Sequence, residues 1–591
     1  LSAVETLGCT TVICSDKTGT ITSNQMTIVG AWADGHSYEI TGRGYEAVGH
    51  ILENGTPLGE QELEHVRPFF QHGLLASHGR THEPDETHGD WYALGDPTEA
   101  AFMPLAIKAG LDVDALVDAT PVVDQLPFDS KRKRMTLLRN RKGNLIGYMK
   151  GAASSVLEVC TRVRANGEAT ALSDSIRQTI VDKVEAYSEQ SLRVIALAYR
   201  EFPDKSEDFS IEESEQDFVF LGLVAMLDPP REGVREATRE VHSARVKLFM
   251  LTGDDPITAH AIAERIGMPE GLILTGDDVR EMDDEALNEA LANESVIFSR
   301  VSPQEKYRVV ERLKKMGEVV AVTGDGANDT LSLKRADIGV AMGKQGSEVA
   351  KEASEIVLTD DDFTTLVVAI REGRTIYQNL KSVILASMTS NIGELSCVCL
   401  GFVGAAMGLP IPITAVQILS IDLIGEMLPL MALTFDPAEK RLMQRPPRRM
   451  GSHIINGHRL IELIVFGSLM GLGGYLSFFM VLQTGGNESM AQAATFLGIL
   501  LIQYVNILSR RTLGSVFSRY LFSNPQLWLS LGLSFAVVSL ITGNPDVASW
   551  FGFEALRLQD WLWPVTGALV FLGCFEIRKL LGRSERTEEF H

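Results

Sequence analysis

Seven residues that begin at Asp16, Asp-Lys-Thr-Gly-Thr-Ile-Thr, have the chemistry for phosphoryl transfer. They follow Val12–Cys14, three residues of high strand propensity, so we expect the Asp16 carboxylate at the end of a buried strand. An aspartate can attack a phosphoryl group and hold it as an aspartyl phosphate. Lys17 can neutralise the phosphate, while Thr18 and the following backbone N–H groups can bind its oxygens. A shorter Asp-Lys-Thr-Gly would fit a surface turn equally well.

A second polar turn supplies carboxylates for a metal ion. Residues 323–329, Thr-Gly-Asp-Gly-Ala-Asn-Asp, follow an apolar strand and share the strand-then-turn architecture of the first segment. Carboxylates beside a glycine-rich turn are the oxygen ligands that Mg²⁺ prefers, although acidic turns without metal are common. The sequence predicts a Mg²⁺ site at Asp16, Thr18 and Asp325, with Asn328 and Asp329 as further catalytic candidates.

Two more segments are candidates for phosphate binding. Thr252, Gly253 and Asp254 follow an apolar strand, where a hydroxyl and a glycine backbone suit phosphate oxygens. A plain turn is at least as common an interpretation of three such residues. Arg300 and Lys306 can supply positive charge for phosphoryl transfer, or they can be ordinary solvated helix residues.

The elements that must position these residues alternate between strand and helix. After Asp16, about 200 residues precede the next catalytic-looking motif, and this segment is too long to be a loop. It contains its own strands at 135–138, 145–149 and 194–199 and a helix at 174–188. Strand–helix alternation then resumes, so we expect an α/β doubly wound domain that is interrupted by an inserted α+β domain.

The composition excludes some classes of protein. A chain of 591 residues is too long for one compact domain. Its net charge of −23 argues against a nucleic acid partner and fits a protein that handles cations or Mg-nucleotide. The six cysteines are scattered, without the spacing of a zinc site or a disulfide framework, so buried reduced thiols are expected.

The C-terminal part reads as a membrane domain. Long apolar stretches recur after about residue 375, each long enough to cross a bilayer. Basic residues concentrate in alternate connectors, which predicts that the N-terminal half and the C-terminus are cytoplasmic. We expect six membrane helices, at about 381–408, 413–434, 459–482, 492–509, 526–543 and 561–581.

Polar residues interrupt the first two of these stretches. Such residues are costly inside a membrane and are candidates for function. Carboxylates and an amide on facing helices would form an oxygen cage for a hard cation, and glycines beside them would let the helices loosen. Hydrogen bonds between helices would explain a single serine or asparagine, but hardly three acids. The predicted cation ligands are Ser390, Asn391, Glu394, Asp422 and Glu426, with Gln503 as a weaker candidate from the fourth stretch.

The segment at Asp16 closely resembles the phosphorylation motif of P-type ATPases, and the other motifs occur in that family's order. The resemblance implies a haloacid-dehalogenase-like phosphorylation domain, an inserted nucleotide-binding domain and Mg²⁺ with ATP as substrate. Six C-terminal spans favour the type II cation pumps over the heavy-metal pumps. By the same resemblance, nucleotide would bind at Glu99, Phe128, Lys133, Lys150, Arg193 and Arg300.

The residue type at position 18 distinguishes between two kinds of enzyme. Phosphatases of the haloacid-dehalogenase type carry a second aspartate two residues after the nucleophile, as a general acid. Here that position is Thr18, so an acyl phosphate on Asp16 should persist. A persistent phosphoenzyme suits an energy transducer more than a phosphatase.

The transported ion is left open between Ca²⁺ and Na⁺/K⁺. Ser-Asn-Ile-Gly-Glu at 390–394 resembles calcium pumps, whereas Asp422 with Glu426 lies nearer the sodium/potassium pump pattern. The family's actuator domain and first four spans would precede Leu1, which is not an initiator methionine. We therefore expect the chain to be a portion of a longer protein, and expect that it cannot complete a transport cycle alone.

The sequence thus predicts an integral membrane protein that uses ATP to move a cation through a phosphorylated Asp16. A membrane-anchored phosphohydrolase and a non-transporting regulatory or truncated subunit remain as alternatives. The partners expected are ATP, an inorganic cation and the lipid bilayer. The predicted domains are a phosphorylation domain in two parts, 1–25 and 227–360, a nucleotide-binding domain, 26–226, and a stalk with membrane helices, 361–591.

Overall fold

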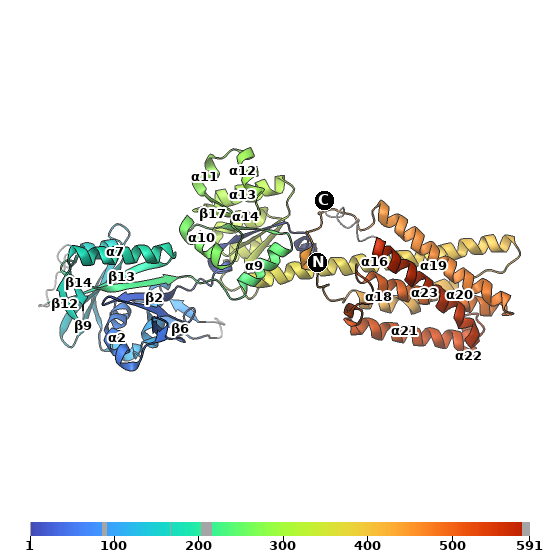
Figure 1. Cartoon of the computed structure of the whole chain (residues 1–591), viewed down its shortest axis with the longest axis horizontal. Coiled ribbons are helices and arrows are strands. Elements are labelled where there is room, and N and C mark those ends of the chain that lie inside the picture. Colours follow the sequence, from blue (N-terminus) through green and yellow to red (C-terminus); the bar gives the residue numbers. More distant parts are fainter. Residues whose placement is uncertain (1, 86–90, 166, 203–214, 582–591) are drawn as a thin grey trace.

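The computed structural model describes residues 2–85, 91–165, 167–202 and 215–581. Three bodies lie in a row along its long axis: a sheet-rich body, an α/β body and a helical bundle (Figure 1). Helix α16 (Phe363–Ala406) runs from the α/β body into the bundle as one continuous element. The middle body and the bundle are therefore joined by a single long helix.

A seven-stranded parallel sheet forms the centre of the α/β body, and β1 (Val12–Asp16) lies in its middle. On one side β1 pairs with β15 (Lys247–Leu251), and on the other with β18 (Val320–Gly324). The strand order reverses at β1, which makes the end of this strand the switch point where open α/β sheets bind ligands. The remaining strands are β16 (Leu272–Thr275), β17 (Ser295–Ser299), β19 (Ile338–Met342) and β20 (Ile356–Leu358).

Strand β1 is apolar because both faces of the sheet are covered. Val12 and Cys14 belong to one hydrophobic core and Ile13 to the other, and none of the three has exposed surface. Continuous apolar runs are typical of parallel strands buried on both faces. The covering helices include α9 (Val234–Ser243), α10 (Pro256–Arg265), α11 (Gly276–Glu281), α12 (Asp284–Leu291), α13 (Pro303–Lys315), α14 (Thr330–Arg335) and α15 (Glu348–Ala353).

The excursion after β1 forms a separate eleven-stranded sheet. The chain enters at β2 (Thr27–Ala33) and leaves at β14 (Phe218–Leu227), and these two strands pair antiparallel. The chain therefore enters and leaves the insertion at adjacent strands. As a result, the insertion does not interrupt the parallel sheet of the α/β body. The other strands are β3 (His36–Ile40), β4 (Ile51–Glu53), β5 (Thr56–Pro57), β8 (Val122–Asp129), β9 (Arg134–Arg141), β10 (Asn144–Gly151), β11 (Cys160–Ala165), β12 (Glu168–Ala171) and β13 (Arg193–Phe202). The helices are α2 (Glu60–Leu75), α3 (Pro97–Ala100), α4 (Phe102–Lys108), α5 (Val113–Asp118), α6 (Ala153–Glu158) and α7 (Asp174–Glu189).

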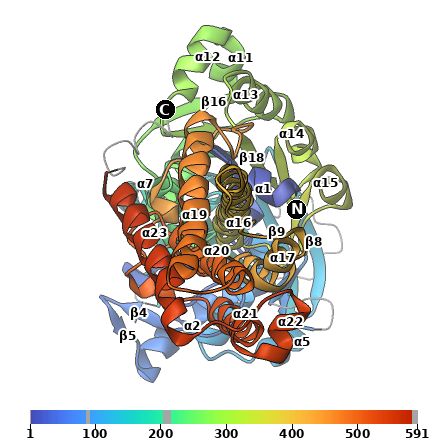
Figure 2. The ribbon, with the colours of Figure 1, turned by 90° about the vertical axis from the view of Figure 1, so that its right-hand side faces the viewer.

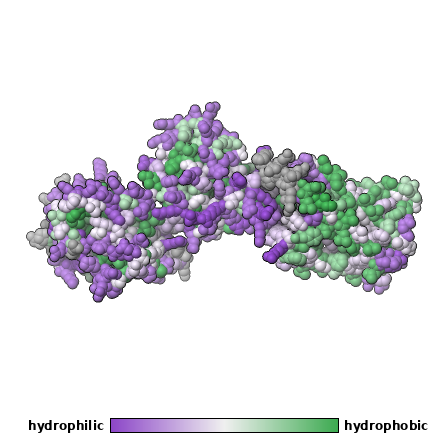
Figure 3. All heavy atoms as spheres, in the orientation of Figure 1, coloured by the Kyte–Doolittle hydropathy of each residue, from purple (hydrophilic) through white to green (hydrophobic). Residues whose placement is uncertain are grey.

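The helical bundle has an apolar surface. Figure 3 shows hydrophobic residues over most of its visible face, whereas the other two bodies are largely hydrophilic. Among the described residues, five helices are long and apolar enough to cross a membrane. They are α16, the interrupted helix over Ala415–Leu433, α19 (Gly457–Gln483), α20 (Glu488–Arg510) and α21 (Pro525–Gly543).

The sixth predicted stretch forms α23 (Leu562–Leu581), which packs against α19 and α20 in the same bundle. Glu576, Arg578 and Lys579 lie near the end of α23, so every 18-residue stretch of this helix contains three charged residues. Seen along the long axis, α23 and α19 lie side by side, and α20 lies next to α19 (Figure 2). Helix α20 is the most enclosed of the candidate spans.

The expected loosening occurs in the second span but not in the first. Between α17 (Ala415–Ser420) and α18 (Met427–Leu433), residues Ile421–Glu426 form one π-helical turn. Such turns often mark functional sites. Helix α16 passes Gly393 without a break, and the glycine has another reason: a Cβ there would lie 2.9 Å from the sulfur of Met470 on α19. Gly393 therefore allows close helix packing.

Candidate functional site

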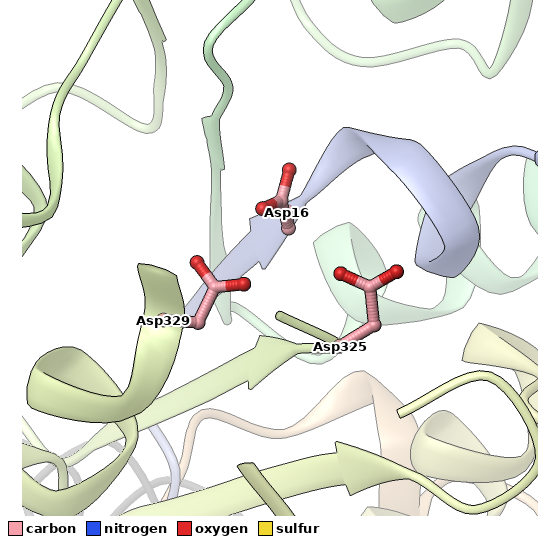
Figure 4. A group of neighbouring side chains, drawn as sticks. All are labelled: Asp16, Asp325 and Asp329. Carbon is pink, nitrogen blue, oxygen red and sulfur yellow. The ribbon is translucent and has the colours of Figure 1, made fainter. Parts of the chain in front are cut away.

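Asp16 lies at the end of β1 beside two more carboxylates. Asp325 and Asp329 follow the neighbouring strand β18, and Figure 4 shows the three side chains gathered at this edge of the sheet. One carboxylate oxygen of each lies within 4.8 Å of the others. The structure thus brings together Asp16 and the acidic turn, 309 residues further along.

Lys306 holds two of these carboxylates together. Its Nζ lies 2.6 Å from Asp16 Oδ2 and 2.7 Å from Asp329 Oδ1. Burial raises the pKa of Asp16 to about 6, although the charge of Lys306 opposes the shift. Burial lowers the pKa of Lys306, but the two acids outweigh it and the net shift is upward. Lys306 is therefore a charged member of the site.

Asp325 has a different environment. No described cation pairs with its carboxylate, and burial, together with the charge of Asp329, raises its pKa. Its Oδ2 lies 2.6 Å from the position that a Cβ of Gly19 would occupy, and Gly19 has a φ of +72°. Only a glycine fits both the backbone conformation and this close approach. The Asp-Lys-Thr-Gly turn is thus shaped around Asp325.

Lys17 turns toward the Thr-Gly-Asp segment. Its Nζ lies 2.5 Å from Asp254 Oδ2 and 4.0 Å from Asp228 Oδ2. Thr252 is buried, and its hydroxyl accepts a hydrogen bond from the Asp254 backbone at 3.1 Å. A Cβ at Gly253 would meet no atom within 4 Å, so the space beside this turn is open.

Thr18, Asn328 and Arg300 are more accessible. Thr18 is partly exposed, and Asn328 is exposed in the middle of η2 (Ala327–Asp329). Arg300 is exposed, and its backbone N–H donates to Asp254 O at 2.8 Å. The structure therefore places Arg300 at the same sheet edge as Asp16, rather than in the insertion with the other predicted nucleotide-binding residues.

Lys150 and Glu99 form the centre of a second group, in the insertion. Lys150 Nζ lies 3.1 Å from Glu99 Oε1 and donates to Ala76 O at 2.8 Å. Burial lowers the pKa of Lys150 to about 8, although Glu99 opposes the shift. Glu99 also accepts from the backbone of His78 at 2.7 Å. Phe128 is 62% exposed, which leaves its ring free to stack on a ligand.

The turn that carries Lys133 packs against the segment that carries Lys150. The Ala152 N–H donates to Lys133 O at 2.9 Å. A Cβ at Gly151 would lie 2.5 Å from that same oxygen, so a glycine is required for the contact. Arg193, on β13, donates to Thr98 Oγ1 at 3.2 Å. The predicted nucleotide-binding residues of the insertion thus come from segments that contact one another.

A third group lies inside the helical bundle. Glu394 on α16 and Asp422 and Glu426 on the π-helical turn have carboxylate oxygens within 4.8 Å of one another. Glu394 and Glu426 are buried, and Asp422 is more exposed. Four buried polar side chains here have atoms without a hydrogen-bond partner among the described residues: Ser390 Oγ, Glu394 Oε1, both oxygens of Glu426, and Gln503 Nε2.

Unpaired buried polar atoms are rare in folded proteins, and a bound ion or water is one way to satisfy them. The donor set here is oxygen-rich and acidic, which suits a hard cation. Asn391, one residue beyond Ser390, is exposed on α16, and the structure gives no contact between it and this cluster. The three acids predicted from the sequence are brought together, while Asn391 is not.

Three families of sequences match the chain in order. Residues 66–233 match P-type ATPase, cytoplasmic domain N; residues 306–370 match haloacid dehalogenase-like hydrolase; and residues 410–581 match Cation transporting ATPase, C-terminus. The calcium-transporting ATPase of Bacillus subtilis is 35% identical over 95% of this chain and 63% of its own length. These matches, in order along nearly the whole chain, support a P-type cation-transporting ATPase.

Other members of this family match over a similar range. Cation-transporting ATPase pma1 of Synechocystis is 34% identical over 95% of this chain and 61% of its own length. Calcium-transporting ATPase 1 of Bacillus cereus is 32% identical over 98% of this chain and 64% of its own length. The chain thus spans less than two thirds of these P-type ATPases. The family predicted from the motifs is confirmed, as are the α/β fold and the multi-pass membrane character.

Sequence reasoning missed two carboxylates that support these groups. Glu215 is buried and accepts from Arg132 at 2.7 Å and from Arg134 at 2.9 Å, on either side of Lys133. Asp361 is buried before α16 and accepts three backbone N–H groups from the loop 343–345, at 2.6–2.9 Å. Neither has a local sequence motif, because each acts on residues distant in the chain.

Proposed function

We propose that this chain is the catalytic and membrane portion of an ATP-driven cation pump, in which Asp16 accepts the γ-phosphoryl group of ATP. One observation carries the proposal: α16 is continuous from Phe363, two residues after Asp361, to the cation cluster at Glu394. Asp361, just before it, is bonded to the loop next to Asp325. A continuous helix that starts next to the Asp361 contact and carries Glu394 offers a physical connection between the two sites.

The chemistry at Asp16 follows from its neighbours. Lys306 keeps the carboxylate oriented and offsets the repulsion from Asp329, so that an oxygen of Asp16 can attack phosphorus. Lys17 and the Thr252 turn supply a cation and a hydroxyl for the transferred phosphate. Thr18 brings no carboxylate, so the aspartyl phosphate would persist.

Mg²⁺ fits the residues present at this edge of the sheet. Asp16 and Asp325 offer carboxylate oxygens within 4.8 Å, and no described cation pairs with Asp325. Asp16, Thr18 and Asp325 would hold the ion, which would supply charge neutralisation for the phosphate when bound. Gly19 leaves room for the Asp325 carboxylate, because a Cβ there would lie 2.6 Å from Asp325 Oδ2.

ATP would bind in the insertion. The exposed ring of Phe128 is available for the purine, and Lys150 and Lys133 offer cations from two packed segments. Glu99 would orient Lys150. Arg193 and Arg300 complete the proposed set, with Arg300 on the side of Asp16. The insertion and the α/β body would have to approach each other for phosphoryl transfer.

The transported cation would bind at Ser390, Glu394, Asp422 and Glu426, with Asn391 at the exposed margin. Several relatives are named as calcium-transporting ATPases, which makes Ca²⁺ the first ion to test, ahead of Na⁺ and K⁺. We further propose six spans that include α23, cytoplasmic catalytic domains and the domain boundaries predicted from the sequence. The basic connectors support this orientation.

The decisive experiment labels the intact protein that contains this chain with γ-labelled ATP and isolates acid-stable phosphoprotein. Labelling should require Mg²⁺, respond to one cation and vanish in Asp16→Asn. Asp284→Asn, an exposed carboxylate on α12 of the same domain, is the matched control and should label normally. Labelling retained in Asp16→Asn would show that Asp16 is not the phosphorylated residue. Rapid phosphate release without a trapped intermediate would instead favour the membrane-anchored phosphohydrolase.

A further inference from the structure

Gln503, Asn506 and Arg510 lie along one face of α20, three and four residues apart. Gln503 and Asn506 have no exposed surface, and Arg510 is 8% exposed. Their polar atoms must therefore be satisfied by one another and by adjacent helices. Because an amide has a donor side and an acceptor side, these hydrogen bonds determine which way each amide is turned.

Arg510 fixes the orientation of Asn506. A guanidinium can only donate, and Arg510 Nε lies 2.9 Å from Asn506 Oδ1. On the other side, Asn506 Nδ2 donates at 3.1 Å to the backbone carbonyl of Ala386 on α16, which can only accept. With a donor on one side and an acceptor on the other, the amide of Asn506 has one permitted orientation.

Asn506 in turn fixes Gln503. The same Nδ2 donates at 3.0 Å to Gln503 Oε1. The oxygen of Gln503 thus accepts from Asn506, and the amino group of Gln503 is left to donate to another partner. Gln503 neighbours Glu426, where both carboxylate oxygens are buried without a partner, as is Gln503 Nε2. An unpaired donor therefore lies beside unpaired acceptors of the acidic cluster.

Arg510 is itself held from two other helices. Its guanidinium donates to Glu462 Oε1 on α19 at 3.2 Å and to Thr389 Oγ1 on α16 at 2.8 Å. Thr389 is adjacent to Ser390, whose hydroxyl is among the unpaired atoms of the cluster. The arginine is thus anchored independently of the cation site, so it can impose an orientation on the amides.

We propose that Arg510 and Asn506 are positioning residues of the cation site, which hold Gln503 as a hydrogen-bond donor to Glu426 and keep its oxygen out of cation coordination. The inference rests on the proposed role of the cluster in cation binding. It replaces the expectation that Gln503 is a cation ligand. The oxygens left for the cation are those of the acids and of Ser390.

Asn506→Asp tests whether Asn506 determines the orientation of the Gln503 amide. An aspartate there still accepts from Arg510, but it cannot donate to Gln503, so the amide of Gln503 is free to reverse and offer its oxygen to the cation. We expect Ca²⁺ to bind about tenfold more tightly, since one further oxygen ligand becomes available. Binding of radiolabelled Ca²⁺ to the intact protein in membranes measures this without turnover.

Gln503→Leu separates the two roles of the glutamine. If Gln503 is a donor, the single variant binds Ca²⁺ no more weakly than the wild type, and Asn506→Asp/Gln503→Leu shows none of the gain of Asn506→Asp. A merely structural role of Asn506 would not make its effect depend on Gln503. Gln492→Leu, which removes another buried amide from α20 outside the cluster, is the matched control.

Two results would overturn the inference: a tenfold weaker binding in Gln503→Leu with no gain in Asn506→Asp, or a gain in Asn506→Asp that survives Gln503→Leu. Arg510→Lys should keep the wild-type affinity for Ca²⁺, because a lysine ammonium group, like a guanidinium, can only donate to Asn506. A melting temperature of the intact protein in detergent close to that of the wild type reports that the membrane helices of each variant are folded. Failure of the wild type to bind Ca²⁺, Na⁺ or K⁺ would count against the proposed function itself, which is a different outcome.

Discussion

Lys306 Nζ lies 2.6 Å from Asp16 Oδ2, although 290 residues separate them in the chain. The same ammonium group bonds to Asp329, so one buried cation joins two carboxylates at the edge of the sheet. This contact holds the acidic turn beside β1. It also offsets the repulsion between Asp16 and Asp329, whereas the charge of Asp329 still raises the pKa of Asp325.

Loss of Lys306 should both destabilise the α/β body and prevent phosphorylation. Lys306→Met leaves two buried carboxylates unpaired, a change that typically costs about 3–5 kcal/mol. We expect a lower melting temperature of the intact protein in detergent and no acid-stable phosphate. Lys315→Met, at the exposed end of the same helix, is the control. Normal labelling of Lys306→Met would show that the ion pair is dispensable for the chemistry.

Nucleotide binding should weaken at alkaline pH. Burial lowers the pKa of Lys150 to about 8, so its positive charge is present below that pH and is lost above it. A neutral amine no longer attracts the nucleotide, and the loss of affinity approaches about tenfold per pH unit once the pH is well above the pKa. Titration of a fluorescent ATP analogue at several pH values measures the effect.

The matched variant for this pH effect is Lys150→Arg, because a guanidinium keeps its charge throughout the range. Its nucleotide affinity should not fall between pH 7 and about pH 9. Lys183→Arg, on α7, should keep the wild-type pH dependence. The same alkaline loss in Lys150→Arg would assign the effect to another group.

Glu215 should support nucleotide binding through the turn that carries Lys133. Its carboxylate is buried and pairs with both Arg132 and Arg134. Glu215→Gln weakens two charge-assisted hydrogen bonds, worth about 1.5–3 kcal/mol each, and should release the turn. We expect ATP to bind about tenfold more weakly while the maximal phosphorylation level is unchanged.

Glu158→Gln is the control for Glu215, because Glu158 pairs with the same Arg134 at 3.4 Å but is 76% exposed. Exposed ion pairs contribute little, so this variant should bind ATP normally. Equal losses in both variants would mean that Arg134 alone matters and that burial of Glu215 does not.

Asp361 should couple the two ends of the pump. Asp361→Asn keeps the side-chain shape and tolerates the left-handed backbone, φ +59°, but lacks one of the two carboxylate oxygens that accept from the loop 343–345. We expect ATP and cation binding to be retained while cation stimulation of phosphorylation is lost. Asp360→Asn, one residue earlier and exposed, should behave as the wild type. Full stimulation in Asp361→Asn would exclude this contact from coupling.

The acids of the bundle should determine cation affinity. Glu394→Gln and Glu426→Gln each remove a buried charge from the cluster, so half-maximal phosphorylation should require at least about tenfold more cation. ATP binding should stay unchanged, because the insertion is a separate body. Glu488→Gln removes an exposed acid from the start of α20 and serves as the control. An unaltered cation requirement in both cluster variants would contradict the proposed site.

Much of the site was predictable where the signal is local. The apolar strand before Asp16 and the glycine turn after it lie within a dozen residues, and backbone sterics alone favour a strand that ends in a turn. The spacing of Asp422 and Glu426 likewise placed both on one helix face. Partners from distant segments were not predictable. Lys306 was a candidate source of positive charge for phosphoryl transfer, but its contacts with Asp16 and Asp329 were not predicted, and Glu215 carried no motif at all.

The sequence by itself determined the family, the α/β core and the membrane character, because each depends on residue types in a fixed order or on apolar length. Only the tertiary structure decided which groups satisfy one another. It paired Lys306 with Asp16, kept α16 continuous past Gly393 and turned the oxygen of Gln503 toward Asn506. The physical reason is that burial forces each polar atom to find a partner, and that partner lies on another element of the fold.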